Sequence, residues 1–179
     1  MLQPDDTALI IIDVQGKLAT LMHEKERLFQ NLTRLIRGAQ ILEIPIVLTE
    51  QYPQGLGETV PEIKALMPDV QPIIKMSFSC CGEEAFLDAI EELDREQLLV
   101  AGIESHVCVY QTVADLLDAG YNVEVVADAV SSRTAENYKL GLSRMEDMGA
   151  WLTSTEMALF ELLRVAGTPT FKEISKLVK

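Results

Sequence analysis

The stretch QLLVAGIESHVCVYQTVADLLDAG, residues 97–120, decides the fold of this chain. It opens on an apolar run, which is typical of a strand buried inside a parallel sheet. Gly102 interrupts the run, and Ser105 is a suitable N-cap for a helix over about 106–119. The apolar residues on one face of that helix are Val109, Val113, Leu116 and Leu117. The pattern predicts a strand, a turn and a helix that stops near Gly120.

The same alternation of strand and helix continues on both sides of this unit. Apolar runs predict further strands at 8–13, 44–49, 72–75, 121–127 and 150–153. Helical spacing predicts helices at about 24–44, 60–66, 86–93 and 134–149. Thr153 with Glu156, and Thr170 with Glu173, fit the capping box and predict two final helices. Such an order specifies an α/β fold, with a six-stranded parallel sheet and helices on both faces.

Composition narrows the possible partners. The chain has 179 residues, which suggests a single domain over 1–179, and its net charge is −13. An acidic chain is not suited to nucleic acid or an anionic membrane, because phosphate binding needs clustered Lys and Arg. No apolar run approaches the roughly 20 residues of a membrane span, and the N-terminal residues do not resemble a signal or transit peptide. We therefore expect a cytoplasmic protein that acts on a small molecule.

Three reactive side chains fall at the ends of separate predicted strands. Asp13 ends the first strand, Lys75 ends the third, and Cys108 lies just past the fourth. Ligands of open parallel sheets bind outside the carboxyl ends of the strands, so all three residues are expected on one rim. Each charge alone could be a solvated loop residue, and the cysteine alone could fill the core. Their shared rim favours a catalytic group.

These residue types together can perform acyl transfer. Cys108 is predicted in the first turn of a helix, where the helix dipole should lower the pKa of its thiol. Asp13 could accept the thiol proton and return it to a leaving group, while Lys75 stabilises the thiolate and orients the carboxylate. Backbone N–H groups around 104–108 would bind the oxyanion. The predicted reaction runs through a thioester that water hydrolyses.

Other cysteines and histidines are weaker candidates. His106 and Cys108 are two residues apart and point to different faces of a helix, so a direct Cys–His pair is not expected. Cys80 and Cys81 are adjacent and are expected as free thiols at the start of a helix, because a vicinal disulfide is strained. Tyr52 and Phe78 could supply an apolar pocket wall, with Gln15 nearby, although either aromatic ring could equally belong to the core.

The motifs around the three reactive residues resemble one known family. IIIDVQ around Asp13, IIKMSFS around Lys75 and GIESHVCV around Cys108 are similar to the isochorismatase-like cysteine hydrolases, and ADAVSS at 127–132 extends the likeness. The resemblance implies a Rossmann-like three-layer α/β/α sandwich with an Asp–Lys–Cys triad. It also implies a cis peptide between Ile103 and Glu104, with the amides of Glu104 and Cys108 as the oxyanion hole. The small isochorismatase-domain branch resembles this chain most.

Differences between this sequence and other branches of the family narrow the reactions that we expect the protein to catalyse. Nicotinamidases of this family bind a metal through histidines after the second strand, where this chain reads TEQYPQGLGET without histidine. We therefore expect no metal and no cofactor. True isochorismatases lack the nucleophilic cysteine that is present here. The resulting hypothesis is a cofactor-independent hydrolase of a small amide, ester or related acyl compound; the alternative is a catalytically idle binding or oligomer-forming module with the same fold.

The C-terminal part favours self-association. Mean hydropathy is positive, +0.14, in a chain of strong negative charge. Apolar residues lie on more than one face of the predicted helix after 153, which indicates cover on both sides. They are Trp151, Met157, Leu159, Phe160, Leu162 and Leu163. We expect a homo-oligomer, unless the final helix at 171–178 covers this surface within one chain.

Overall fold

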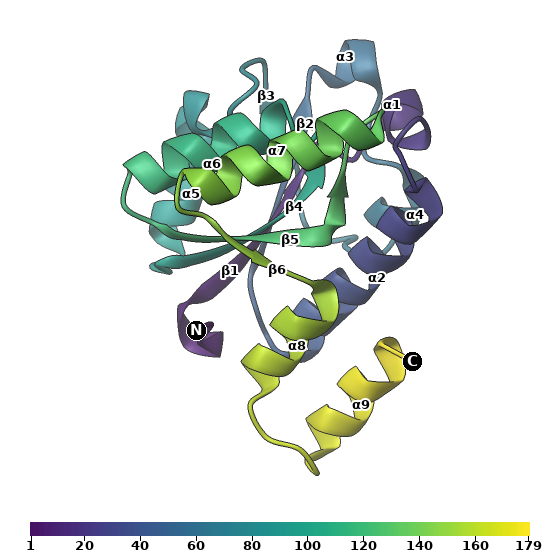
Figure 1. Ribbon diagram of the computed structural model, residues 1–179, viewed down its shortest axis with the longest axis vertical. Helices are drawn as coiled ribbons and strands as arrows, with labels where there is room; N and C mark the ends of the chain where they lie inside the picture. The colour runs from purple at the N-terminus through teal and green to yellow at the C-terminus, as the bar shows by residue number, and fades with distance from the viewer.

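Six parallel strands form one sheet in the computed structural model, which describes residues 1–179 (Figure 1). The strands are β1 (Thr7–Ile12), β2 (Ile46–Gln51), β3 (Ile73–Lys75), β4 (Gln97–Ile103), β5 (Asn122–Ser131) and β6 (Trp151–Thr153). Their order is β3-β2-β1-β4-β5-β6, and every pair is parallel. The predicted six-stranded parallel sheet is confirmed. The order reverses direction beside β1, which is where such sheets bind their ligands.

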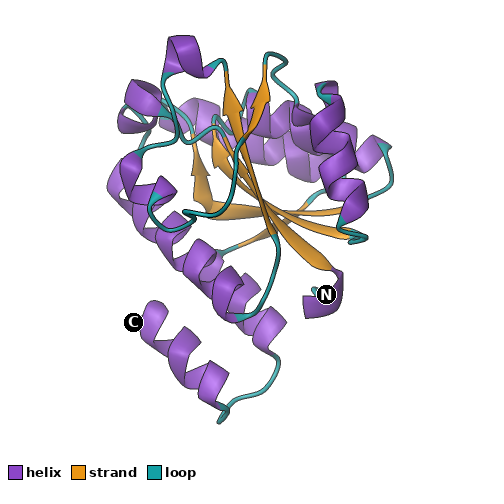
Figure 2. Cartoon of the chain, turned by 180° about the vertical axis from the view of Figure 1, so that it is seen from behind, coloured by secondary structure: helices purple, strands orange, loops and turns teal.

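Helices cover both faces of the sheet (Figure 2). One layer contains α2 (Lys25–Ile41), α4 (Pro61–Lys64), α8 (Thr155–Leu163) and α9 (Pro169–Leu177), and the other contains α5 (Glu84–Glu92), α6 (Cys108–Asp118) and α7 (Ala135–Asp147). The sequence prediction missed two short helices, α1 (Gly16–Thr20) and α3 (Pro53–Leu56), and two 3-10 turns, Pro4–Asp6 and Cys80–Gly82. These four segments have too few residues to show an apolar period.

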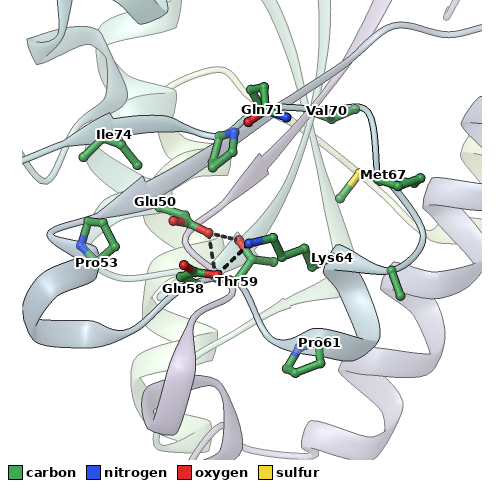
Figure 3. A pocket seen from close by; sticks show the side chains of 13 residues that line it. Glu50, Pro53, Glu58, Thr59, Pro61, Lys64, Met67, Val70, Gln71 and Ile74 are labelled. Carbon is green, nitrogen blue, oxygen red and sulfur yellow. Dashed lines mark hydrogen bonds and ion pairs between the residues drawn. The ribbon is translucent and has the colours of Figure 1, made fainter.

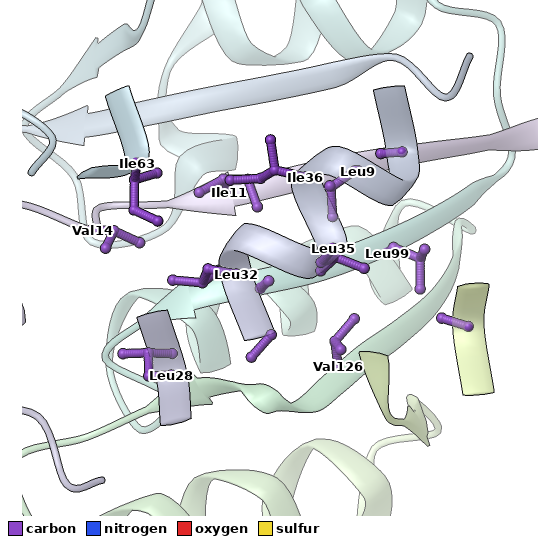
Figure 4. Packing of buried hydrophobic residues seen from close by; sticks show 14 of the residues in the cluster. Leu9, Ile11, Val14, Leu28, Leu32, Leu35, Ile36, Ile63, Leu99 and Val126 are labelled. Atoms are coloured by element: carbon purple, nitrogen blue, oxygen red, sulfur yellow. The ribbon is translucent and has the colours of Figure 1, made fainter. Parts of the chain in front are cut away.

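The central strand β1 is buried on both faces. Its sequence, TALIII, is apolar after the first residue, and all six residues are inaccessible to solvent. Alternate side chains point to opposite faces of a strand. Leu9 and Ile11 therefore pack with α2 in one apolar cluster (Figure 4), while Ile10 and Ile12 join the cluster beneath α5 and α6. This double burial explains why the run shows no polar alternation.

The contact between β1 and β4 depends on a glycine. Gly102 pairs with Ile12 and has a φ of +117°. A Cβ atom at this position would lie 2.1 Å from the Ile12 carbonyl oxygen. Only glycine combines this backbone conformation with so close an approach. The glycine thereby brings together the strand ends that carry Asp13 and the turn before Cys108.

Three helix caps differ from the prediction. Ser105 does not cap α6, which begins at Cys108 without a side-chain cap; its hydroxyl instead lies 2.6 Å from the Ser132 hydroxyl. Helices α8 and α9 are capped by Ser154 and Thr168 rather than by Thr153 and Thr170. For α8 and α9, a nearby hydroxyl residue was an equally good cap by sequence. Thr134 caps α7 as predicted.

The final helix covers part of the apolar surface for which we expected a partner chain. Leu159 and Leu162 are buried against α2, and the Phe160 ring packs on Phe171 of α9, with 6.4 Å between ring centroids. These α8 residues therefore need no partner chain to cover them, because α9 covers a second face of the helix, which is the alternative given from the sequence. Trp151 and Met157 remain 72% and 60% exposed at the β6 edge of the sheet.

No helix of the structure combines the length and the apolar character that crossing a membrane would require.

Candidate active site

Asp13, Lys75 and Cys108 come together at the carboxyl edge of the sheet. Asp13 follows β1, Lys75 is the last residue of β3, and Cys108 is the first residue of α6 (Figure 1). Only β2 separates β1 from β3 in the sheet, and the long Lys75 side chain spans this distance to Asp13. All three residues are buried, with Lys75 only 1% exposed. The rim predicted from the sequence therefore exists, although its residues lie beneath the surface rather than on it.

Asp13 and Lys75 form a buried ion pair. Lys75 Nζ lies 2.7 Å from Asp13 Oδ2. The ammonium also donates to the carbonyl oxygens of Ser77 and Phe78, at 3.1 and 3.0 Å. The Thr49 hydroxyl donates to Asp13 Oδ1 at 2.8 Å. These bonds compensate much of the cost of burying two charges, and they fix both groups in position.

The thiol of Cys108 is held in its protonated form at rest. Burial of the sulfur raises its pKa to about 12, the negative charge of Asp13 adds to the rise, and the charge of Lys75 opposes it. The prediction of a lowered thiol pKa was therefore wrong. Desolvation of the charged form outweighs the favourable field at the helix N-terminus. A thiolate forms here only if a base removes the proton, and Asp13 is a carboxylate that lines the same cavity as Cys108.

Gln51 connects the thiol with the lysine, and the sequence analysis missed it. The Cys108 thiol donates to Gln51 Oε1 at 3.1 Å, and Lys75 Nζ lies 3.5 Å from the same oxygen. Gln51 is the last residue of β2 and pairs with Lys75 in the sheet. Its position at a strand end beside the two charged strand ends was the available signal. An uncharged amide did not stand out among the polar residues of the following loop.

The turn from β4 into α6 presents free backbone donors. The peptide bond between Ile103 and Glu104 is cis. The amide of Ser105 donates to Ser131, and the amides of Val107 and Val109 both donate to the Glu104 carbonyl. The amides of Glu104 and Cys108 have no acceptor within the protein. Two unsatisfied N–H groups beside a thiol are the donors that an oxyanion needs.

Side chains fasten this turn to the end of β5. The Glu104 carboxylate accepts hydrogen bonds from the Arg133 backbone amide and guanidinium, at 3.1 and 3.0 Å. His106 Nδ1 lies 2.9 Å from the Ser132 hydroxyl, which also contacts Ser105. His106 is thus engaged away from the thiol, in line with the expectation that it does not pair with Cys108.

A cavity of about 130 Å³ opens above the thiol. Its walls are Asp13, Leu18, Gln51, Leu56, Phe78, Ile103, Glu104, Val107 and Cys108. Among the residues expected around the pocket, only Phe78 lines this cavity. Gln15 is buried and its amide bonds to backbone groups of Gln51 and Gly57, whereas the Tyr52 ring lies over Gly55. The predictions for Gln15 and Tyr52 failed because both side chains contact neighbouring turns instead of the cavity.

The two other cysteines stay reduced and lie outside the cavity lining. Cys80 and Cys81 are free thiols in the 3-10 turn before α5, as expected. Burial raises the pKa of Cys80 to about 12 and that of Cys81 to about 11. Neither thiol ionises near neutral pH. The structure also contains no group of three or more His, Cys, Asp and Glu side chains arranged to hold a metal ion.

The fold and this site define a class, an α/β/α protein with a buried thiol, carboxylate and ammonium at the carboxyl edge of a parallel sheet. Residues 7–157 match the isochorismatase domain family. The chain is 41% identical, over 98% of its own length and 86% of the relative, to a secreted isochorismatase effector of Phytophthora sojae. It is 40% identical to the isochorismatase domain-containing protein 2 of Danio rerio, over 96% of this chain and 86% of that protein. The chain therefore belongs to the isochorismatase family, and it has the fold of these hydrolases.

Solved structures agree with this assignment. The structure named MAR1 ribonuclease from Caenorhabditis elegans aligns with a TM-score of 0.92 and 40% identity, over 99% of this chain and 91% of that one. The YcaC product of Escherichia coli, described as an octameric hydrolase, aligns with a TM-score of 0.92 and 26% identity, over 98% and 89%. YcaC of Pseudomonas aeruginosa, with covalent acrylamide, gives the same TM-score and identity, over 98% and 90%.

Proposed function

We propose that this protein is a cofactor-independent cysteine hydrolase of small, uncharged amides or esters. The observation that carries the proposal is the buried Asp13–Lys75 ion pair at 2.7 Å, because Asp13 lines the same cavity as Cys108, the only thiol in the cavity wall. Burying a charged pair is costly unless the pair has a task or extensive hydrogen bonding. Buried charges beside a nucleophile are typical of catalytic groups.

In the first half of the reaction, Asp13 accepts the proton of the Cys108 thiol. The sulfur then attacks the carbonyl carbon of the substrate, and the electron pair of the C=O bond moves to oxygen. The amides of Glu104 and Cys108 donate to this oxyanion. When the oxyanion collapses, the bond to the leaving group breaks and protonated Asp13 returns the proton to the departing nitrogen or oxygen. The acyl group stays on sulfur as a thioester.

In the second half, water replaces the leaving group. Asp13 accepts a proton from a water molecule while the oxygen of that water attacks the thioester carbon. The same two amides bind the second oxyanion. The carbon–sulfur bond breaks, and Asp13 returns the proton to the thiolate. Lys75 keeps its proton throughout. Its charge stabilises the thiolate and holds the carboxylate toward the sulfur.

The cavity supports a small and uncharged acyl group. At about 130 Å³ the cavity is smaller than the roughly 300–1,000 Å³ of sites for drug-sized ligands, so it suits a small acyl group. No Lys or Arg lines the cavity, and Lys75 is already surrounded by Asp13 and two carbonyl oxygens. A carboxylate on the substrate would therefore be buried without a partner. Acrylamide, bound covalently in the Pseudomonas YcaC structure, is a small uncharged amide.

The experiment is a panel of short amides and esters, each compared with a carboxylate-bearing analogue such as succinamate. Ammonia or alcohol release measures turnover, and intact-protein mass spectrometry detects the acylated enzyme. Activity and adduct should be absent in Cys108→Ala and retained in Cys81→Ala, which removes a half-buried thiol outside the cavity. Binding of the panel without any turnover or adduct would favour the idle binding module instead. Faster turnover of the charged analogues would refute the substrate class.

We also propose that the protein is a homo-oligomer without nucleic-acid partners. Trp151 and Met157 leave apolar surface at the β6 edge, beside a hollow of about 390 Å³. The Escherichia coli YcaC structure is described as octameric, which supports self-association. A net charge of −13 opposes the binding of RNA, even though the Caenorhabditis elegans structure carries the name ribonuclease.

A further inference from the structure

A second hollow lies on the side of β2 and β3 that faces away from the thiol (Figure 3). Side chains alternate along a strand, so Thr49 and Gln51 of β2 point to the catalytic group while Glu50 points the opposite way. Glu50 pairs with Ile74 of β3, and both side chains line the hollow. Its volume is about 920 Å³, several times that of the catalytic cavity.

Glu50 is an unusual residue for the wall of an open hollow. Its side chain is only 2% exposed, so its charge is largely removed from water. Oε1 accepts hydrogen bonds from the backbone amide and the hydroxyl of Thr59, both at 2.7 Å. Oε2 has no hydrogen-bond donor and no ion-pair partner within the protein. Oε2 is not one of the fully buried oxygen atoms that lack a partner, so it keeps access to the hollow, where a ligand can reach it.

No other charge of the hollow forms an ion pair with this oxygen, although the pKa of Lys64 is raised mainly by Glu58 and in smaller part by the Glu50 charge. Lys64 is the only cation among the lining residues, and its ammonium lies 2.6 Å from Glu58 Oε2. With two carboxylates and one ammonium, the lining has a net charge of −1. The remaining walls are mostly apolar or proline, and they include Pro53, Pro61, Met67, Val70 and Ile74. Such walls suit an alkyl or aromatic group, and the net negative charge suits a cation.

We propose that this hollow is a second small-molecule site, which takes a ligand with one cationic nitrogen. The ammonium or guanidinium group donates to Glu50 Oε2, and the apolar part of the ligand lies along Met67, Val70 and Ile74. A charge-assisted hydrogen bond of this kind is stronger than a neutral one. The site is separate from the catalytic cavity, so it does not depend on the proposed hydrolase activity.

The test uses the full chain with n-butylammonium as the probe and 1-butanol and butyrate as controls. Calorimetry measures the affinity, and the NMR shift of the Thr59 amide reports on the Glu50 carboxylate to which that amide donates. We expect saturable binding of n-butylammonium, with a matching shift at Thr59 and no saturable response to the two controls. Equal responses to butanol, or no saturable shift at Thr59, would overturn the proposal.

Two isosteric variants locate the ligand. Glu50→Gln keeps an acceptor oxygen for Thr59 but removes the charge, and it should weaken the binding of n-butylammonium about tenfold or more. Glu62→Gln removes an exposed carboxylate of α4 that does not line the hollow, and it should leave the affinity unchanged. The unfolding temperature of each variant shows whether it is folded. Undiminished binding by folded Glu50→Gln contradicts the assignment, and the Thr59 shift in the wild type decides the matter if that variant does not fold.

Discussion

The side-chain oxygen of Gln51 accepts a hydrogen bond from the Cys108 thiol at 3.1 Å, so an uncharged residue contacts this sulfur directly. Gln51 is the last residue of β2 and Cys108 is the first residue of α6, so the contact joins a strand end to a helix start at the carboxyl edge of the sheet. The oxygen stabilises the neutral thiol, because it can accept a hydrogen bond from the thiol but cannot donate one to the thiolate.

The first prediction follows from this contact. Gln51→Glu should raise the pKa of Cys108 still further, because it places a negative charge beside the sulfur. Alkylation of Cys108 by iodoacetamide at pH 8 should slow by about tenfold, the effect of about one pKa unit. Peptide mass spectrometry measures the rate, and Cys81 in the same sample is the internal control. An unchanged rate at Cys108 would show that Gln51 does not act on the thiol.

The second prediction concerns the buried ion pair. Asp13→Asn leaves the Lys75 ammonium buried without its counter-ion, so we expect the free energy of unfolding to fall by about 3–5 kcal/mol. The double variant Asp13→Asn/Lys75→Met should recover part of this loss. Both variants should remain inactive, since each lacks the base. Urea unfolding measures the stability, and Glu58→Gln, which breaks an exposed pair, should change it little. Equal stability of the single and double variants would argue against the pair.

The third prediction is a loss of stability at alkaline pH. Burial raises the pKa of Cys80 from 9.0 to about 12. Between these values the unfolded chain releases the thiol proton and the native chain keeps it, so the unfolded state is increasingly favoured as pH rises. Below pH 9 both states keep the proton and the effect disappears. Cys80→Ala should reduce the slope of stability against pH by about 1.4 kcal/mol per unit between pH 9 and 12. Parallel curves for wild type and variant would contradict the raised pKa.

The fourth prediction concerns metal. The proposed mechanism uses only protein groups, so turnover should survive exhaustive treatment with EDTA followed by gel filtration. Metal content by mass spectrometry shows whether the treatment was complete. A loss of activity that zinc or manganese restores would mean that the loop after β2 holds a metal despite its lack of histidine.

The fifth prediction concerns assembly. Light scattering coupled to size exclusion should give a mass several times that of the 19.9 kDa chain. Trp151→Glu places a charge on the exposed apolar patch and should shift the protein toward the monomer. Met148→Glu, on a half-exposed apolar side chain at the end of α7, is the matched control and should leave the mass unchanged. A wild-type mass near 20 kDa at micromolar concentration would refute the oligomer.

The sequence predicted the strands well because each has a physical signature of its own. TALIII in β1 is apolar after its first residue because both faces of the strand are buried, and this pattern does not depend on any distant residue. The charged strand ends, Asp13 and Lys75, could be assigned to one edge because parallel strands end on the same side of a sheet. That assignment required only that the strands be parallel, and it did not require their exact order in the sheet.

Features that depend on exact register or on packing could not be predicted. The cap of α8 is Ser154 rather than Thr153, and both are hydroxyl residues next to each other in the chain. Gln51 was missed because its role arises from a contact with Cys108, more than fifty residues away along the chain. The pKa of Cys108 was predicted in the wrong direction, since the burial of the sulfur depends on side chains from several elements.

The close approach of Gly102 to the Ile12 carbonyl also limits how this sequence can evolve. Gly102 and Asp13 have no side-chain contact to preserve, yet any larger residue at 102 would meet the backbone that leads directly into Asp13. Such a substitution would separate Cys108 from Asp13, the proposed nucleophile and base, without altering an atom of either. The distance between these two side chains thus depends on the main chain, and random mutagenesis should find Gly102 as intolerant of change as the proposed catalytic residues.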